Sequence, residues 1–145
     1  MPQYAPPLRD MQFLLHEVFD VCAHYKDTSR YAEVDADTIN AVLEEGGRFA
    51  AEVAFPLNMT GDSEGCVLDR DTHEVATPQG FRQAYAQYVE GGWPALSCDP
   101  EHGGQGLPFV LNQCLYEMLN SANQAWTMYP LSLIHISEPT RQEAI

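Results

Sequence analysis

The sequence predicts an all-α fold, and two observations support that prediction. Apolar residues recur at spacings of three and four in four separate segments, which is the pattern of helices with one buried face. No two segments show the alternation of apolar and polar residues that is typical of paired strands. The 145 residues, of which 45% are hydrophobic, suit one packed domain, and the absence of an internal repeat indicates that the fold is built once.

The first helix is predicted over residues 8–25, directly after Pro6 and Pro7. Its buried stripe is expected to consist of Met11, Leu14, Leu15, Val18 and Cys22. Residues 26–34 are polar and are expected to form a connection.

The second helix is predicted over residues 38–54. Asp35 or Asp37 can cap it, because a short carboxylate accepts hydrogen bonds from the free N–H groups of a first helical turn. Its stripe is expected to consist of Ile39, Val42, Leu43, Phe49, Ala50 and Val53. Gly46 and Gly47 lie in the middle, where each costs up to about 1 kcal/mol relative to alanine, and they predict a kink or a close crossing with another helix.

Pro56 ends the second helix, and residues 58–76 carry glycines and scattered acids, a composition typical of a loop. The third helix is predicted to start with Thr77 as its N-cap and Pro78 as its first residue, and to stop at the glycines of residues 91–92. One of its faces is expected to carry Phe81, Ala84, Tyr85 and Tyr88.

The fourth helix is predicted to start at Pro108, after turns that include the glycine cluster of residues 103–106, and to end near Ala125. Its inward residues are expected to be Leu111, Leu115, Met118, Leu119 and Ala122. The four predicted helices account for the fold class.

Charge and cysteine content narrow the function classes. Seven Lys and Arg against 21 Asp and Glu give a formal net charge of −14, which repels nucleic acid and anionic membrane surfaces. No apolar run reaches the ~18 residues of a membrane span, and the N-terminus lacks the features of a secretion signal, so a cytoplasmic location is expected. The cysteines form no CxxC pair, so buried free thiols are expected at Cys22, Cys66, Cys98 and Cys114.

No residue pattern identifies a catalytic or metal site. A glycine cluster such as that of residues 103–106 can cradle a phosphate, but this one follows a turn and not a strand, which favours a structural turn. The acids of residues 62–71 lack the register of a calcium loop, and the histidines form no HxxxH pair. No serine or cysteine lies in a nucleophile motif. The residues alone therefore indicate an acidic helical module.

Residues 131–145, LSLIHISEPTRQEAI, differ in character from the rest of the chain. The run resembles the translation of a sequencing-library adapter followed by a sample index, so we expect a non-native tail after Pro130. A natural C-terminal extension is the alternative. His135 is excluded from any proposed chemistry for this reason.

Residues 91–108, GGWPALSCDPEHGGQGLP, place a Gly-Trp pair and a leucine before an acidic turn and a GGxG phrase. This arrangement resembles the N-terminal helical domain of the flavin-dependent acyl-CoA dehydrogenases. Three further phrases occur in the same order as in that family: PLRDMQFLLHEVFD, FAAEVAFPLNMTGDSEGC and TPQGFRQAY. Together they resemble the longer subgroup that includes the 3-methylmercaptopropionyl-CoA dehydrogenases, over residues 2–130.

The resemblance implies a division of the chain. Residues 1–34 would be an N-terminal extension helix, residues 35–130 an incomplete N-terminal helical domain truncated before a β domain, and residues 131–145 the non-native tail. The family enzyme holds FAD mostly between a β domain and a C-terminal four-helix bundle, together with an adjacent subunit. The FAD site is therefore expected to be largely absent from this chain.

The resemblance also implies a reaction. In the family, a glutamate removes the α-proton of an acyl-CoA, a hydride passes to FAD, a trans-2-enoyl-CoA forms, and electrons leave for an electron-transfer flavoprotein. The base lies in the absent bundle, so no catalytic residue is expected here, and Glu90, Glu101 and Glu117 are not candidates. The segment after the GGxG helix lines the acyl-tail pocket, which implies substrate-binding roles for Trp126, Thr127 and Tyr129. Core packing is the alternative for Trp126.

Two other functions compete with an oxidoreductase fragment: a non-catalytic acidic helical interaction module, and an acidic metal-binding protein. The exposure of apolar side chains distinguishes an oxidoreductase fragment from an interaction module. A piece of a larger enzyme leaves apolar residues without intrachain partners, whereas an independent module buries them. The residues to compare are Trp93, Phe109, Trp126 and Tyr129.

Overall fold

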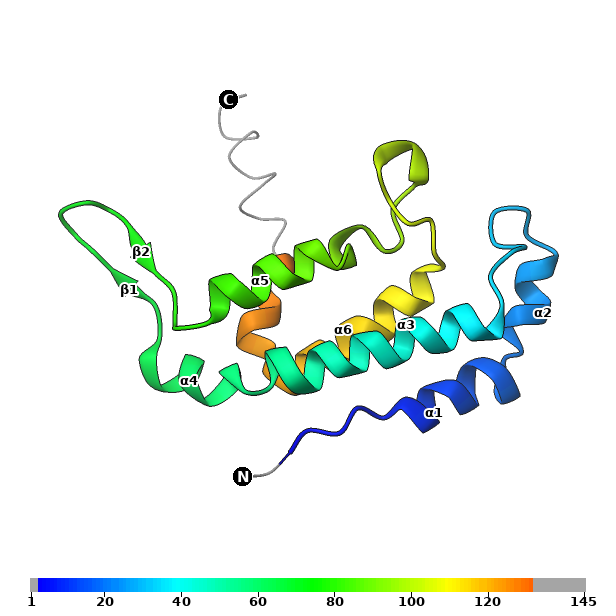
Figure 1. The fold of residues 1–145 in the computed structure, drawn as a ribbon, viewed down its shortest axis with the longest axis horizontal. Helices are drawn as coiled ribbons and strands as arrows, with labels where there is room; N and C mark the ends of the chain where they lie inside the picture. The colour runs from blue at the N-terminus through cyan, green and yellow to red at the C-terminus, as the bar shows by residue number, and fades with distance from the viewer. Residues whose placement is uncertain (1–2, 132–145) are drawn as a thin grey trace, which may run out of the picture.

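The structure is a computed structural model that describes residues 3–131, and it is predominantly helical (Figure 1). In chain order its elements are α1 (Leu8–Gln12), η1 (Phe13–Val18), α2 (Val21–Lys26), α3 (Ala36–Phe49), η2 (Ala50–Ala54), α4 (Leu57–Glu64), β1 (Val67–Leu68), β2 (Val75–Ala76), α5 (Phe81–Glu90), η3 (Trp93–Ala95), η4 (Pro100–His102) and α6 (Phe109–Leu131). The elements η1 and η2 are π-helical, and η3 and η4 are 3₁₀-helical. The predicted all-α class is confirmed, with a small antiparallel hairpin as the only sheet in the described part. The proposed tail, including His135, lies outside the described residues apart from Leu131.

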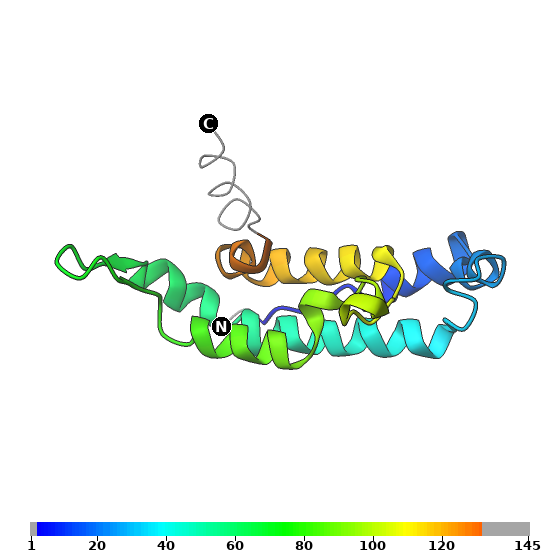
Figure 2. The same cartoon turned by 90° about the horizontal axis from the view of Figure 1, so that it is seen from above.

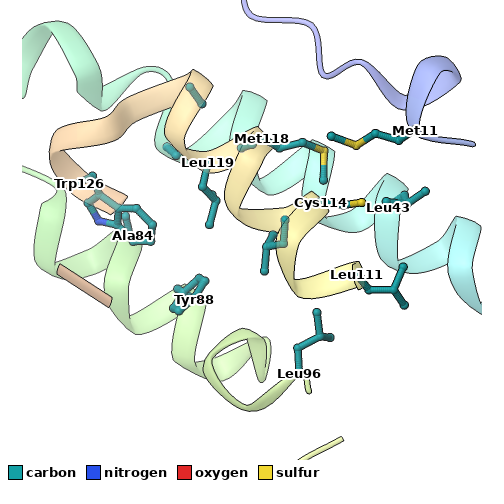
Figure 3. Packing of buried hydrophobic residues seen from close by; sticks show 14 of the residues in the cluster. Met11, Leu43, Ala84, Tyr88, Leu96, Leu111, Cys114, Met118, Leu119 and Trp126 are labelled. Atoms are coloured by element: carbon teal, nitrogen blue, oxygen red, sulfur yellow. The ribbon is translucent and has the colours of Figure 1, made fainter. Parts of the chain in front are cut away.

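The helices form two layers around one core. Figure 2 shows α6 in one layer and α3 with α5 in the other, while the hairpin projects from one end of the bundle. The core residues come from all of the longer helices: Met11, Leu15, Ile39, Leu43, Ala50, Ala54, Phe81, Ala84, Tyr88, Leu96, Leu111, Cys114, Leu115, Met118, Leu119, Ala122 and Trp126. Figure 3 shows side chains of α5 and α6 meeting across this core.

Helices α3 and α6 approach closely at Gly46. A Cβ atom at this position would lie 3.0 Å from Leu115 Cδ1 and 3.3 Å from Met118 Cε. On the other side of the helix, a Cβ atom at Gly47 would lie 3.1 Å from Leu8 Cδ2. The glycine pair therefore serves two close crossings, and α3 continues through it without interruption.

The first predicted helix is divided in two at residues 19–20: α1 continues directly into η1, and α2 follows the break. The π-helical turns of η1 are wider than α-helical turns, so the apolar stripe changes phase there. As a result Leu14 and Val18, which were predicted to face inward, are exposed, whereas Leu15 is buried. At Asp20 the backbone turns into the left-handed region (φ 43°), and the Asp20 side chain caps the short helix α2 by accepting a hydrogen bond from the Ala23 N–H.

Asp35 caps α3, as one of the two predicted alternatives, by accepting a hydrogen bond from the Thr38 N–H at 2.8 Å. The helix starts at Ala36, two residues earlier than predicted, and continues through η2 to the predicted end at Ala54. The predicted loop at residues 58–76 is wrong in its first part, which forms α4. Gly61 in α4 makes room for the ring of Phe81, because a Cβ atom there would lie 2.6 Å from Phe81 Cζ.

Two predicted helix ends are also wrong. Helix α5 starts at Phe81 and not at Pro78, because Gly80 (φ 86°) forms its N-terminal boundary and Leu57 occupies the space beside it. Tyr85 on this helix is exposed, unlike the other members of its predicted face. Helix α6 starts at Phe109, one residue after the predicted Pro108, and continues past Ala125 to Leu131, with an interruption that shapes the candidate site.

The prediction of four buried thiols is wrong for three of them. Cys114 is buried, Cys22 is partly buried, and Cys66 and Cys98 are exposed. All four are free. Cys66 and Cys98 lie beyond helix ends, where the chain is exposed and no helical periodicity indicates a buried face.

Candidate functional site

A small pocket lies between α5 and the last turns of α6. It has a volume of about 150 Å³ and is lined by Thr77, Phe81, Arg82, Tyr85, Trp126 and Tyr129. The lining is mainly aromatic, and Arg82 is its one charged member. Such a pocket is suited to a small apolar group, because aromatic rings remove apolar surface from water without leaving polar atoms unpaired.

The pocket exists because α6 changes direction at Asn123. This residue has non-helical backbone angles (φ −160°, ψ 86°) inside an otherwise continuous helix. Beyond it, the chain turns toward α5, as Figure 1 shows for the orange end of α6. The last turns of α6 thereby face the first turns of α5.

Trp126 forms the inner wall of the pocket. It is 1% exposed, and its indole Nε1–H donates a hydrogen bond to the Phe81 carbonyl oxygen at 3.2 Å. Its ring meets that of Tyr88 edge-on, with centroids 5.6 Å apart, and lies 5.8 Å from that of Phe49. Figure 3 shows Trp126 beside Ala84 and Tyr88 of α5. The indole is therefore held by α3, α5 and α6 together.

Tyr129 lies at the opening of the pocket, where it is 45% exposed. Its ring contacts that of Phe81 edge-on, and its hydroxyl oxygen lies 3.2 Å from Cys66 Sγ, within hydrogen-bond distance. This contact with the thiol, together with partial burial, raises the pKa of Tyr129 to about 12. Tyr129 is therefore a neutral phenol at physiological pH.

Two of the three predicted site residues, Trp126 and Tyr129, meet in this pocket. Thr127 does not line it: the side chain is fully buried, and its Oγ1–H donates to the Asn123 carbonyl oxygen at 2.8 Å. Thr127 thus supports the interrupted turn behind the wall.

Sequence reasoning missed the other side of the pocket, which Phe81, Arg82 and Tyr85 form. The spacing of Phe81 and Tyr85, four residues apart on one helix, places both on the same face and was the available signal. Asn123 gave only a weak signal: asparagine favours caps and turns over helix interiors, but the apolar stripe continues across it, which predicts an uninterrupted helix.

The glycine cluster of residues 103–106 does not fit a phosphate cradle. A cradle needs free backbone N–H groups, but the N–H groups of Gly104, Gln105 and Gly106 donate to carbonyl oxygens of the same loop. Their acceptors are the carbonyls of Asp99, Ala95 and Cys98, respectively. The loop is therefore a structural turn. Because its N–H groups are already bonded, residues 103–106 do not fit the pyrophosphate of FAD.

The acidic hairpin has a structural role as well. Oδ1 of Asp69 accepts hydrogen bonds from the N–H groups of Asp71 and Thr72, which lowers the pKa of Asp69 and shapes the turn between β1 and β2. Within residues 3–131, no three His, Cys, Asp or Glu side chains are grouped closely enough to hold a metal ion. No helix in this range is both long enough and apolar enough to span a membrane.

Of the four apolar residues that distinguish a fragment from an independent module, two are exposed, as expected for a fragment, and two are buried or partly buried, as expected for a module. Phe109 is 60% exposed and Tyr129 is 45% exposed, whereas Trp126 is buried and Trp93 is partly buried. Other exposed apolar side chains are Phe13, Leu14, Val18, Phe19, Met59, Val67, Leu68, Val75, Tyr85, Val89 and Met128. The core is therefore complete, but much apolar surface faces solvent.

Comparison with known proteins shows that this helical unit is similar to part of three curated acyl-CoA dehydrogenases. No family model matches the chain. The chain is 38% identical over 128 residues to a 3-methylmercaptopropionyl-CoA dehydrogenase of Ruegeria pomeroyi, and this match covers 88% of the chain and 21% of the relative. It is 31% identical over 129 residues to a broad-specificity linear acyl-CoA dehydrogenase of Mycobacterium tuberculosis. This match covers 89% of the chain and 21% of the relative.

A third relative is a butyryl-CoA dehydrogenase of Syntrophomonas wolfei, which is 30% identical over 132 residues, with 87% of the chain and 21% of the relative covered. The chain spans about a fifth of the length of these curated relatives. Nearly all of its described helical unit corresponds to their N-terminal portion. Over the portion that it shares with them, the chain is a homologue of the acyl-CoA dehydrogenase family.

Proposed function

We propose that the chain is the N-terminal helical part of an enzyme that oxidises an acyl-CoA thioester to the trans-2-enoyl-CoA, with FAD as hydride acceptor. The observation that carries the proposal is the similarity of almost nine tenths of the chain to acyl-CoA dehydrogenases. In this proposal residues 1–34 are an extension, residues 35–130 belong to the helical domain, and residues 131–145 are not native. The parent enzyme would work in the cytoplasm as a homo-oligomer and pass electrons to an electron-transfer flavoprotein.

The role proposed for this chain is to form one wall of the acyl-tail pocket. Trp126 and Tyr129 supply apolar surface at the pocket, and Thr127 holds the turn behind them. Burying an acyl tail gains about 0.8 kcal/mol per CH₂ group, so a dry aromatic wall contributes affinity without any polar contact. The volume of about 150 Å³ is comparable to that of a cavity that accommodates benzene, so a short acyl end fits the part of the pocket that this chain forms.

No residue of this chain is proposed to take part in proton or hydride transfer. Glu90 and Glu101 are exposed, as is Glu117, and none of the three lines the pocket. The glycine loop that could have held a phosphate has its N–H groups already bonded. The base and the flavin contacts are therefore proposed to come from other parts of the parent enzyme, where FAD supplies the hydride chemistry.

A chimera tests the proposal. Residues 3–130 would replace the matching N-terminal portion of the Ruegeria pomeroyi enzyme, and the product would be assayed for bound flavin and for oxidation of acyl-CoA thioesters of increasing chain length. We expect a yellow protein that oxidises short thioesters. In the chimera, Trp126→Ala should raise KM for the thioester by about tenfold, since it removes a buried aromatic wall.

Gln124→Ala is the matched control, because Gln124 is exposed two residues away from Trp126 and does not line the pocket. It should leave KM unchanged. A chimera that folds and holds flavin but oxidises no acyl-CoA would contradict the proposed function. Equal effects of the two substitutions would contradict the proposed wall.

A further inference from the structure

The interruption of α6 has no cause in its own apolar pattern. Leu119, Ala122 and Trp126 continue one stripe at spacings of three and four, which by itself predicts a straight helix through this region. The backbone nevertheless leaves the helix at Asn123, which is 1% exposed. Oδ1 of Asn123 accepts a hydrogen bond from the Trp126 N–H at 3.0 Å. This is the geometry of an N-cap, so Asn123 begins a new helical segment that contains Trp126.

The same side chain also binds a distant part of the backbone. Nδ2 of Asn123 donates to the carbonyl oxygen of Ala54 at 3.0 Å, across 69 positions of sequence. Ala54 is the last residue of η2, and the N–H that an α-helix would direct to its carbonyl, that of Asn58, donates to Phe55 instead. Asn123 therefore satisfies one carbonyl at the end of η2 and one N–H in α6.

These bonds connect directly to the pocket. The Trp126 backbone is fixed by Asn123, and the Trp126 indole is fixed by the carbonyl of Phe81, the first residue of α5. The buried bonds thus link η2, α6 and α5 in one continuous path. Because all of these groups are shielded from water, leaving one of them unpaired costs more than the bond itself contributes.

We propose that Asn123 is the positioning residue of the pocket: by ending one helical segment and starting the next while bound to Ala54, it sets Trp126 and Tyr129 against α5. That this pocket receives an acyl tail rests on the proposed function. The positioning itself rests only on the hydrogen bonds and the backbone angles at Asn123.

Hydrogen exchange of the Trp126 indole N–H in the full chain tests the proposal without any substrate. The chain has two tryptophans, and Trp93→Phe identifies the Trp126 resonance in the NMR spectrum. Asn123→Ala removes both side-chain bonds and should speed exchange of this N–H by about tenfold or more. Asn123→Ser keeps a cap acceptor for the Trp126 N–H but loses the bond to Ala54, so it should speed exchange less than Asn123→Ala does.

The matched control is Leu111→Ala, which leaves a cavity in the same helix at the end far from the pocket. It lowers stability through lost packing, and the Trp126 exchange rate should change only as much as the loss of global stability requires. If Asn123→Ala and Leu111→Ala speed exchange equally at matched stability, Asn123 only stabilises the fold and the proposal is overturned.

If Asn123→Ala does not fold, Asn123→Ser decides by comparison with Leu111→Ala: exchange faster than the loss of stability requires supports the positioning role, and exchange that follows stability alone overturns it. Placing Asn123→Ala in the chimera adds a readout in which KM should rise more than kcat falls. An inactive chimera that carries Asn123 would count against the proposed function, while the exchange rates still determine the role of Asn123.

Discussion

Substitution of Gly104 by alanine should destabilise the turn that leads into α6. A Cβ atom at Gly104 would lie 2.2 Å from the carbonyl oxygen of Cys98 and 2.3 Å from its carbonyl carbon, whereas ordinary contacts are 3.4–4 Å. The obstacle is backbone, so the loop itself must move by about 1 Å. That movement breaks the bonds from the N–H groups of Gly104 and Gly106 to Asp99 and Cys98.

Each such bond contributes about 1 kcal/mol net, and with the added strain the total loss is about 3 kcal/mol. For a domain of this size 1 kcal/mol corresponds to about 4 °C, so Tm should fall by about 12 °C in a thermal melt followed by circular dichroism. Gly103 provides the matched comparison, since it has φ 81° and no atom within 4 Å of an added Cβ. Gly103→Ala should cost about 1 kcal/mol through the left-handed backbone alone.

The predicted losses of stability differ by about a factor of three, and the test is whether Gly104→Ala lowers Tm more than Gly103→Ala does. If Gly104→Ala lowers Tm no more than Gly103→Ala does, the close approach to Cys98 does not determine the glycine requirement. The conclusion that this cluster serves as a structural turn and not as a phosphate site would then lose its main support.

Three further predictions concern single side chains. Burial raises the pKa of Tyr88, whose hydroxyl has no hydrogen-bond partner among the described residues, so Tyr88→Phe should leave the free energy of unfolding unchanged or raise it by up to about 2 kcal/mol, as thermal melts would show. The hydrogen bond from the Thr38 N–H lowers the pKa of Asp35, so the stability that this cap contributes is present above the unfolded pKa of about 4 and is lost as pH falls through the lower folded value. The Tm advantage of the native chain over Asp35→Asn should therefore shrink in acid, as melts at a series of pH values would show. Cys66→Ala removes the thiol beside Tyr129 and should move the pKa of that phenol from about 12 toward its ordinary value, measured from the ¹³Cζ resonance.

Each of these predictions has a contradicting result. A loss of more than about 1 kcal/mol in Tyr88→Phe would mean that the hydroxyl has a favourable partner in solution. A Tm difference for Asp35→Asn that stays constant from neutral to acidic pH would mean that the carboxylate charge does not contribute to the cap. An unchanged Tyr129 titration in Cys66→Ala would exclude the thiol contact as the main cause of the raised pKa.

The sequence by itself determined the class of the fold and most of its core. Leu111, Leu115, Met118, Leu119 and Ala122, the predicted stripe of the last helix, are all buried. Of the two alternatives that the glycine pair in α3 predicts, a kink or a close crossing, the structure shows the crossing, and the phrases around residues 91–108 indicated the family to which the chain proved homologous. These features are local, because a helical period or a short motif is complete within a few turns of chain.

Only the tertiary structure decided where the helices break and which residues form the pocket. The apolar stripe of the first helix changes phase at η1, Gly61 of α4 packs against the ring of Phe81, and α6 changes direction at Asn123. Periodicity identifies an apolar face, but it does not show that a carbonyl 69 positions away will bind a side chain and stabilise a break in a helix. Trp126 could therefore be proposed from the sequence, whereas its hydrogen bond to the Phe81 carbonyl and its support by Asn123 could not. Their roles depend on hydrogen bonds between segments that meet only after the chain has folded.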